Sequence, residues 1–269
     1  MNLERTRRNV VEFALARASR RSGGSVLITG LGVRHPTGRA SVSTQMLVRS
    51  ADLLCWRDFD SRGHAGRGFV VPDWAFRSGI SDEDLRSSGS NRNLLGITLR
   101  GDRPLPSDAW IDSVRTYADS HGLRIATFSQ VVRDRARAEW LADRFGCECV
   151  PWASYEHAAH EANVRSFMGG CSVVVSDRLH ALILALTEGA CPLLVSQDGF
   201  DPKVARTFAG AGIESPVISV DDLACGRFGS AGDPALRVVR ERVYSQLRDA
   251  RGRLSSVSDL MQMALQEPI

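Results

Sequence analysis

The sequence predicts an α/β protein built on parallel sheets, and two observations support this fold class. Short apolar runs alternate with helical stretches of about ten to sixteen residues, a pattern typical of βαβ units with right-handed crossovers. The chain has 269 residues, of which 43% are hydrophobic and 24% are charged, as expected for a globular protein with a substantial core. Its length suits one large or two modest domains.

The N-terminal part of the chain contains the less regular half of this alternation. Its expected elements are a helix over about 2–20, a strand over 25–29, a helix over 41–50, a strand over 52–56 and an apolar run over 68–73. The segment 78–93 is rich in Ser, Gly, Asp and Asn, which is typical of a linker. We therefore expect an N-terminal domain over 1–77, followed by a linker over 78–93.

The alternation is cleaner in the second domain, which we expect over 94–232. Ser107 is placed to cap a helix, and Val132, Ala136 and Trp140 recur at four-residue spacing along the next helix. The expected strands cover 94–100, 124–128, 173–175 and 192–195, and further helices cover 154–168 and 179–186. The remainder, 233–269, is expected to contain one or two amphipathic helices over 234–266.

Charge and composition exclude several classes of protein. The formal net charge is only +3, which argues against nucleic-acid binding as the main function, because phosphate-backbone binders concentrate positive charge. The 34 basic residues comprise 33 arginines and a single lysine, Lys203. No apolar run is long enough to span a bilayer, and the N-terminus lacks the apolar core of a secretory signal, which favours a cytoplasmic protein.

The six cysteines are scattered, and most of them lie in apolar surroundings. Cys147 and Cys149 form a C-x-C pair, but no second pair or nearby histidine completes a zinc site. We expect free, buried thiols and no metal site.

Candidate ligand-binding residues follow the apolar runs, because ligands of parallel α/β sheets bind beyond the carboxyl ends of the strands. These residues are 30–36, Arg57, Asp58, Asp73, Arg100, Gln130, 177–180 and 197–203. Arginine recurs among them, as expected for a phosphorylated or carboxylated ligand. No P-loop motif and no dinucleotide-binding glycine motif at a helix start is present.

One stretch carries a family resemblance. The sequence Ser176-Asp177-Arg178-Leu179-His180, followed by Gly189, Pro192 and Asp201-Pro202-Lys203-Val204, resembles the polysaccharide pyruvyl transferase family. Similar stretches occur upstream in the family's order: Gly30-Leu31-Gly32 with Pro36, Ala51-Asp52-Leu53 leading to Arg57-Asp58, Pro72-Asp73, and Gly96-Ile97-Thr98-Leu99-Arg100. The resemblance covers roughly 25–213, and its specificity comes from the order and spacing of the motifs.

The resemblance implies two Rossmann-like domains in an arrangement like that of GT-B glycosyltransferases. It also implies transfer of a pyruvyl group from phosphoenolpyruvate to a sugar, with phosphate released and no further cofactor. Phosphoenolpyruvate carries two anionic groups that arginine binds well, and protonation of its enol carbon calls for a general acid. We expect His180 to be that acid. The expected donor-binding residues are Arg57, Arg100, Arg178, Leu179, His180 and Lys203, and Gly30 and Gly32 belong to an acceptor-side loop.

Alternatives remain at this point. Arg57 and Asp58 could form a structural ion pair, and Arg100 could simply reach solvent. The chain could be a nucleotide-sugar glycosyltransferase that holds ribose through Glu188 or Asp201. Family members usually begin with a strand and glycine loop upstream of the stretch at 30–36, so the first domain is expected to be truncated at its N-terminus. This short first domain makes a non-catalytic relative the second alternative function. The expected partners are phosphoenolpyruvate and a saccharide, and a lipid-linked acceptor would place the protein at the membrane periphery.

Overall fold

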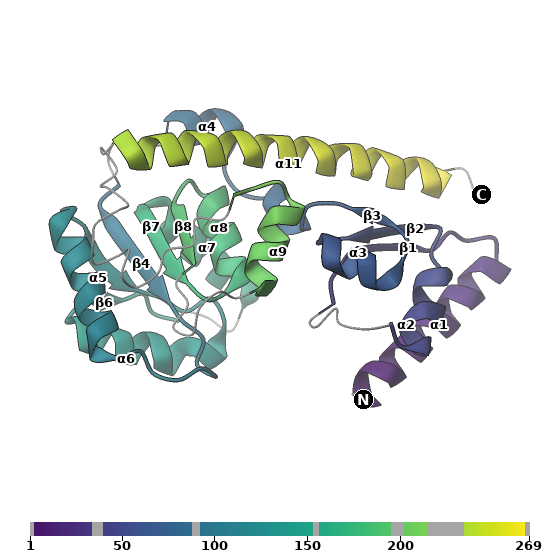
Figure 1. Ribbon diagram of the computed structural model, residues 1–269, viewed down its shortest axis with the longest axis horizontal. Coiled ribbons are helices and arrows are strands. Elements are labelled where there is room, and N and C mark those ends of the chain that lie inside the picture. Colours follow the sequence, from purple (N-terminus) through teal and green to yellow (C-terminus); the bar gives the residue numbers. More distant parts are fainter. Residues whose placement is uncertain are drawn as a thin grey trace. The chain divides into compact units, whose positions relative to one another are not determined.

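The computed structural model describes residues 3–33, 40–87, 92–152, 156–194, 202–214 and 234–266. The chain divides into two compact units (Figure 1). The first unit comprises Met1–Trp74, Arg206–Ile213 and Asp249–Ile269, and the second unit comprises Ala75–Ala205 and Glu214–Arg248.

The first unit contains a three-stranded parallel sheet in the order β1-β2-β3. Its strands are β1 (Leu27–Leu31), β2 (Leu53–Trp56) and β3 (Phe69–Val70), and its helices are α1 (Leu3–Arg21), α2 (Val42–Arg49) and α3 (Phe59–Ala65). Leu27 lies opposite Leu53, and Cys55 lies opposite Phe69. The core of this unit is built on Leu54 and the fully buried Trp56 of β2, which pack with Val48 of α2.

The second unit contains a five-stranded parallel sheet in the order β6-β5-β4-β7-β8. Its strands are β4 (Leu94–Thr98), β5 (Arg124–Thr127), β6 (Glu148–Cys149), β7 (Cys171–Ser176) and β8 (Cys191–Leu194). The intervening helices are α5 (Asp108–Ser120), α6 (Arg135–Phe145), α7 (His157–Gly169) and α8 (Leu179–Thr187). The chain winds outward from β4 to β6 and then returns to place β7 beside β4. This is the Rossmann-type strand order, and its topological switch point lies between β4 and β7.

The sequence of β7 explains its central place in the sheet. All six residues of Cys171–Ser176 are buried, which is characteristic of a parallel strand covered on both faces. Because side chains alternate along a strand, Val173 and Val175 pack in one core cluster with Trp110 of α5, whereas Val174 packs in another with Ala181 of α8. Two hydrophobic layers therefore hold the two strands of the switch point in place.

Three further helices and two 3-10 turns complete the described chain. They are α4 (Asp82–Ser87), α9 (Pro202–Gly210), α11 (Pro234–Gln266), η1 (Trp74–Arg77) and η2 (Val132–Asp134). The helix α4 lies inside the segment that we expected to be a linker, and the expected domain boundaries stay predictions. The C-terminal segment forms one continuous helix, α11, which belongs in part to each unit.

The α/β fold class with Rossmann-like units is confirmed, and Ser107 caps α5 as expected by accepting a hydrogen bond from the Trp110 N–H. The predicted apolar stripe of the next helix was wrong at two of its three positions, because only Trp140 packs against the core. Val132 is 53% exposed and Ala136 is also exposed, whereas Ala138 and Leu141 are buried. The chain first makes the 3-10 turn η2, so α6 begins only at Arg135 and a different set of positions faces the sheet.

The five described cysteines are free, as expected. Burial raises the pKa of the Cys171 and Cys191 thiols to about 12, so both behave as inert core residues. Cys225 lies outside the described residues. Within the described chain, no three His, Cys, Asp or Glu residues gather as metal ligands would. Among the described helices, none combines the length and apolar character that a bilayer-crossing segment needs.

Candidate functional site

The candidate site lies at the carboxyl ends of β4 and β7, the switch point of the second unit. Arg100 follows β4, and Asp177 and Arg178 follow β7. The Asp177 carboxylate ties the two strand ends together, because its Oδ1 accepts a hydrogen bond of 2.8 Å from the Arg100 backbone N–H. The sheet topology therefore brings Arg100 and Arg178, two of the expected donor-binding residues, to the same place.

Arg178 is held by a buried ion pair with Asp134 of the turn η2. Its Nε and Nη2 donate to Asp134 Oδ2 and Oδ1, each at 2.6 Å, and the Gly101 N–H donates to the same Oδ1 at 2.8 Å. The side chains of Arg178 and Asp134 are 10% and 1% exposed. Within the described residues, Nη1 of Arg178 has no partner. The arginine is thus a fixed cation with one edge of its guanidinium still available to an anion.

Arg100 makes a different kind of pair. Its Nε and Nη2 donate to Asp102 at 2.8 and 2.7 Å, and 53% of the Asp102 side chain is exposed. Hydrogen bonding to Arg100 holds the pKa of the Asp102 carboxyl well below its usual range. An ion pair at the surface contributes little net stability, so an anionic ligand can replace the Asp102 carboxylate at low cost. The alternative, in which Arg100 simply reaches solvent, was wrong, because Arg100 is paired with Asp102.

Asp177 belongs to the predicted ligand-binding stretch 177–180, but no chemical role was predicted for it. Burial raises the pKa of its carboxyl, although the Arg100 N–H and the charges of Arg100 and Arg178 act in the opposite direction. A carboxyl group whose pKa is raised, at a strand end where ligands bind, is a candidate general acid. Its position directly after an apolar strand and before Arg178 was the available indication.

The remaining residues of the motif lie on the helices that follow. Leu179 is buried at the first position of α8, and His180 is exposed at the second position, in the first turn of that helix. The N-terminal turn of a helix favours an anion, so this placement suits a side chain that contacts phosphate. Lys203 is half-buried near the start of α9, and the segment 195–201 before it lies outside the described residues.

The other predicted site residues, Gly30, Gly32 and Arg57, lie at the carboxyl edge of the three-stranded sheet of the first unit. Gly30 has a φ of +69°, and a Cβ on Gly32 would lie 2.4 Å from Arg57 Nε, so Gly32 makes room for the arginine. Arg57 Nη1 lies 3.4 Å from Asp73 Oδ2, and its buried Nε has no partner among the described residues. These residues belong to the first unit, and a donor-binding role for Arg57 stays a prediction.

The ion pair considered for Arg57 and Asp58 is absent from the described structure. Asp58 instead caps α3, where its Oδ1 and Oδ2 accept hydrogen bonds from the Ser61 N–H and Oγ at 2.7 and 2.8 Å. Arg206 Nη1 lies 3.6 Å from Asp58 Oδ1 and supplies the nearby positive charge. Arg57 therefore pairs with Asp73, which lies beyond the end of β3, rather than with its sequence neighbour Asp58.

His160 of α7, unlike Asp177, was not among the candidate residues predicted from the sequence. Its ring stacks on Trp152 with a centroid distance of 3.6 Å, and its Nε2 lies 2.8 Å from the carbonyl oxygen of Ser129, just beyond β5. Its Nδ1 is buried without a partner in the described structure. The local sequence indicates only a helical histidine, because the contact with Ser129 joins residues far apart in the chain.

Comparison with known proteins supports the family resemblance carried by Arg178-Leu179-His180. The profile of the polysaccharide pyruvyl transferase family matches residues 6–199, so the chain belongs to this family. The match includes the switch-point residues Arg100, Asp134, Asp177 and Arg178, as well as His180. A search of curated proteins found no match.

Solved structures of other proteins resemble this one more distantly. Acinetobacter baumannii MurG has 16% sequence identity and a TM-score of 0.43, with 92% of this chain and 69% of that chain covered. The E. coli heptosyltransferase WaaC has 15% identity and a TM-score of 0.42, with coverages of 90% and 81%. E. coli heptosyltransferase II has 9% identity and a TM-score of 0.38, with coverages of 88% and 81%.

Proposed function

We propose that the protein transfers a pyruvyl group from phosphoenolpyruvate to a sugar of a polysaccharide or glycan precursor, forming a ketal and releasing phosphate. The observation that supports this most strongly is the Arg178 guanidinium, fixed by Asp134 with Nη1 unpartnered among the described residues. It stands beside Arg100 at the switch point of the sheet. A donor with a carboxylate and a phosphate needs two such cations close together.

The proposed reaction is redox-neutral and needs no cofactor beyond the donor. A proton is added to the methylene carbon of phosphoenolpyruvate, and the neighbouring carbon acquires oxocarbenium character. One sugar hydroxyl attacks this carbon and loses its proton, the C–O bond to phosphate breaks, and a second hydroxyl completes the ketal. The two hydroxyl protons balance the proton delivered to carbon and the proton that leaves with phosphate.

The residues of the second unit divide these tasks in the proposal. Arg178 and Arg100 bind the carboxylate and phosphate, Lys203 adds a point charge, and the first turn of α8 places His180 and the Leu179 N–H near the phosphate. His180 is the proposed proton donor to carbon, and Asp177, whose pKa is raised by burial, is the second candidate for that step. The loop with Gly30 and Gly32 is proposed to face the saccharide, and a lipid-linked saccharide would bring the protein to a membrane surface.

A nucleotide-sugar glycosyltransferase is the competing function, and the position of Glu188 argues against it. Glu188 lies between α8 and β8, at the amino ends of the strands and so at the edge opposite the candidate site. Its carboxylate is buried and accepts a hydrogen bond of 2.7 Å from Arg165. Asp201, the other carboxylate considered for ribose binding, lies outside the described residues.

Phosphate release tests the proposal. The protein is mixed with phosphoenolpyruvate and a panel of saccharide acceptors, and inorganic phosphate and ketal are measured together. We expect acceptor-dependent release in equal amounts, a loss of at least about a hundredfold in Arg178→Gln, and no loss in Arg124→Gln, an exposed arginine of the same unit. Binding of a UDP-sugar without binding of phosphoenolpyruvate would favour the glycosyltransferase, and the absence of both would favour the non-catalytic relative.

A further inference from the structure

The outward face of α1 is apolar and bordered by arginines. Val10, Val11 and Leu15 are 51%, 58% and 65% exposed, and Ala14 and Ala18 on the same side of the helix are exposed as well. The opposite side is anchored: Ala16 is buried, and the Asn9 amide donates to Thr44 of α2 at 3.2 Å. The helix is therefore held by its inner side while it presents an apolar strip to solvent, the reverse of an ordinary surface helix.

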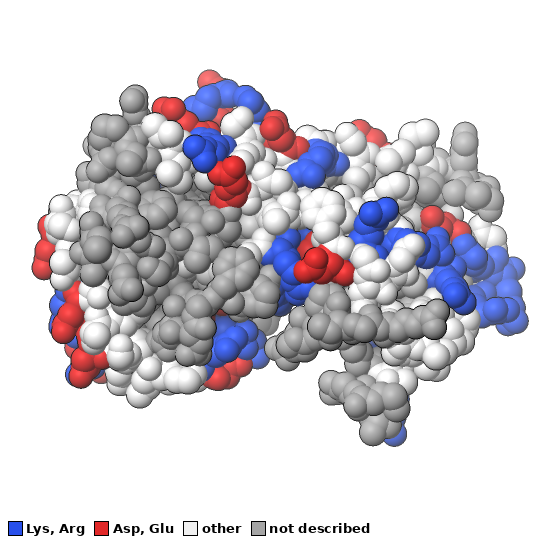
Figure 2. All heavy atoms as spheres, in the orientation of Figure 1, with Lys and Arg blue, Asp and Glu red and all other residues white. Residues whose placement is uncertain are grey.

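Positive charge is concentrated on this helix. The sequence of α1 contains six arginines and two glutamates, so this single helix carries more positive charge than the formal net charge of +3 of the whole chain. Arg17, Arg20 and Arg21 lie in its last two turns, and blue spheres gather over that end of α1 in Figure 2. Arg20 forms an ion pair with Asp52.

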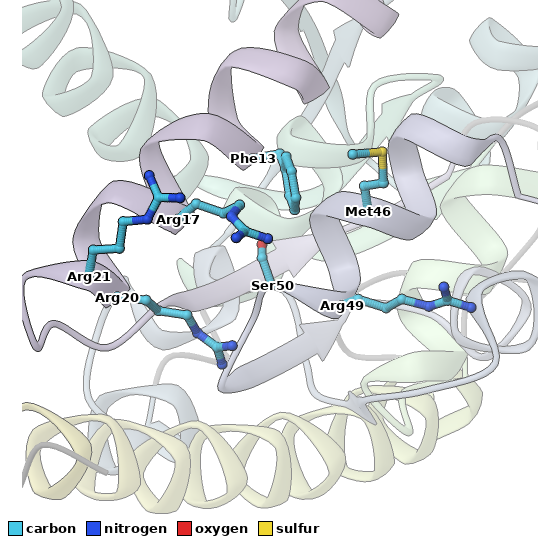
Figure 3. Close-up of a pocket in the computed structure, with 7 residues that line it drawn as sticks. All are labelled: Phe13, Arg17, Arg20, Arg21, Met46, Arg49 and Ser50. Atoms are coloured by element: carbon cyan, nitrogen blue, oxygen red, sulfur yellow. The ribbon is translucent and has the colours of Figure 1, made fainter.

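A pocket of about 510 Å³ opens between α1 and α2 beside this strip. It is lined by Phe13, Arg17, Arg20, Arg21, Met46, Arg49 and Ser50 (Figure 3). Within the described chain, Arg17, Arg21 and Arg49 have no carboxylate partner, and the Arg17 guanidinium lies 5.9 Å from the centre of the Phe13 ring. The pocket thus offers several unneutralised cations together with an apolar wall, which suits the phosphate of an amphiphile.

The second helix extends the same surface. Val42 and Met46 of α2 are 73% and 40% exposed, and Arg49 follows at the next helical position on this side. The combined surface, which we call the α1–α2 face, has exposed aliphatic side chains on two adjacent helices and arginines at its border. We propose that the α1–α2 face docks the protein on an anionic lipid surface, with lipid phosphates in the arginine pocket and the aliphatic side chains in the headgroup layer.

Charge complementarity favours lipid over a second copy of this chain. In a symmetric dimer formed through this face, the unneutralised arginines of one copy would meet those of the other, and this repulsion opposes association. An anionic bilayer supplies phosphates and an apolar layer at the depth that an interfacial helix needs. The proposal concerns a surface of the first unit and does not depend on the chemistry at the switch point.

Vesicle sedimentation with the full chain tests the proposal. We expect binding to vesicles that contain phosphatidylglycerol, little binding to pure phosphatidylcholine, and a decline as salt rises from about 0.05 to 0.5 M. Arg17→Gln/Arg21→Gln/Arg49→Gln should bind more weakly by on the order of a hundredfold, at about fivefold per arginine. Val11→Ser/Leu15→Ser should bind at least about tenfold more weakly.

Controls separate this surface from nonspecific charge. The matched variant Arg86→Gln/Arg124→Gln/Arg248→Gln removes three exposed arginines of the second unit and should keep wild-type binding. All variants alter exposed side chains, and circular dichroism verifies that they fold. Equal binding to both vesicle types, or equal losses in the two arginine variants, would overturn the proposal. So would a lack of vesicle binding together with self-association that Leu15→Ser abolishes.

Discussion

Replacement of Asp134 by Asn perturbs the buried pair on which the candidate site rests. The substitution keeps the shape of the side chain but removes the charge opposite Arg178 and one of its two strong acceptors. Breaking a buried pair by changing one partner costs about 3–5 kcal/mol, and the retained amide oxygen places the expected loss near the lower end, at about 3 kcal/mol. Part of the loss arises because the guanidinium stays buried without its counter-charge.

Denaturant unfolding of the purified variants measures this loss. Asp102→Asn is the matched control, because Asp102 makes the same bidentate contact with Arg100 at the surface, where the expected loss is under about 1 kcal/mol. In the double variant Asp134→Asn/Arg178→Gln the loss should be smaller than the sum of the single losses, since both charges are gone. A loss below about 1 kcal/mol for Asp134→Asn, or strict additivity, would refute the assignment of a buried, coupled pair.

Three further predictions concern individual residues. Lys203→Arg should lower the phosphoenolpyruvate-dependent rate by at least about tenfold, because the bulkier, planar guanidinium does not replace a compact ammonium; a near wild-type rate would end the special role of this lysine. Burial raises the pKa of Asp177, so the folded chain binds this proton more tightly than the unfolded chain, and stability falls as pH rises through the folded pKa. Asp177→Asn should therefore raise the Tm at about pH 7, with a gain that shrinks below about pH 4; a gain that does not change with pH would contradict this. Gly32→Ala should displace the Arg57 side chain, lowering the rate with phosphoenolpyruvate while the unfolding free energy changes by less than about 1 kcal/mol; an unchanged rate would remove Arg57 from the site.

Hydrophobic periodicity was sufficient to predict most elements of the second unit. The apolar run before Ser176 and the cap at Ser107 are local features, and each has a direct structural counterpart in β7 and α5. The start of α6 could not be predicted in the same way. The buried side of that helix is set by the turn η2. In this turn, Asp134 accepts hydrogen bonds from Gly101 and Arg178, both of which are far from it in the sequence.

The ion-pair partners of the charged site residues also could not be predicted from the sequence. Arg178 was found through its motif, but its pairing with Asp134 crosses 44 positions, and no periodicity encodes such a contact. Arg57 was considered with its neighbour Asp58, whereas the fold directs it toward Asp73 and uses Asp58 as a helix cap. Charged side chains reach several ångströms from the backbone, so only the tertiary structure decides which carboxylate they meet.

For the N-terminal helix α1 as well, the sequence alone could not predict which side chains are exposed to solvent. Its sequence predicts a helix over about 2–20, but not which side of the helix is buried. The structure places Asn9 and Ala16 inward and leaves Val11 and Leu15 in solvent, so the more polar contact faces the protein. Because its apolar side chains point to solvent, the α1–α2 face is a candidate for binding a lipid surface.

Titration calorimetry of phosphoenolpyruvate into the wild-type protein and Arg178→Gln tests the central claim most directly. We expect binding to one site in the wild type and a loss of at least about a hundredfold in affinity in the variant, because the carboxylate or phosphate would lose a fixed positive charge and the Nη1 donor. Equal affinity in the two proteins would contradict the assignment of Arg178 to the donor site. No binding to the wild type, together with binding of a UDP-sugar, would contradict the proposed reaction itself.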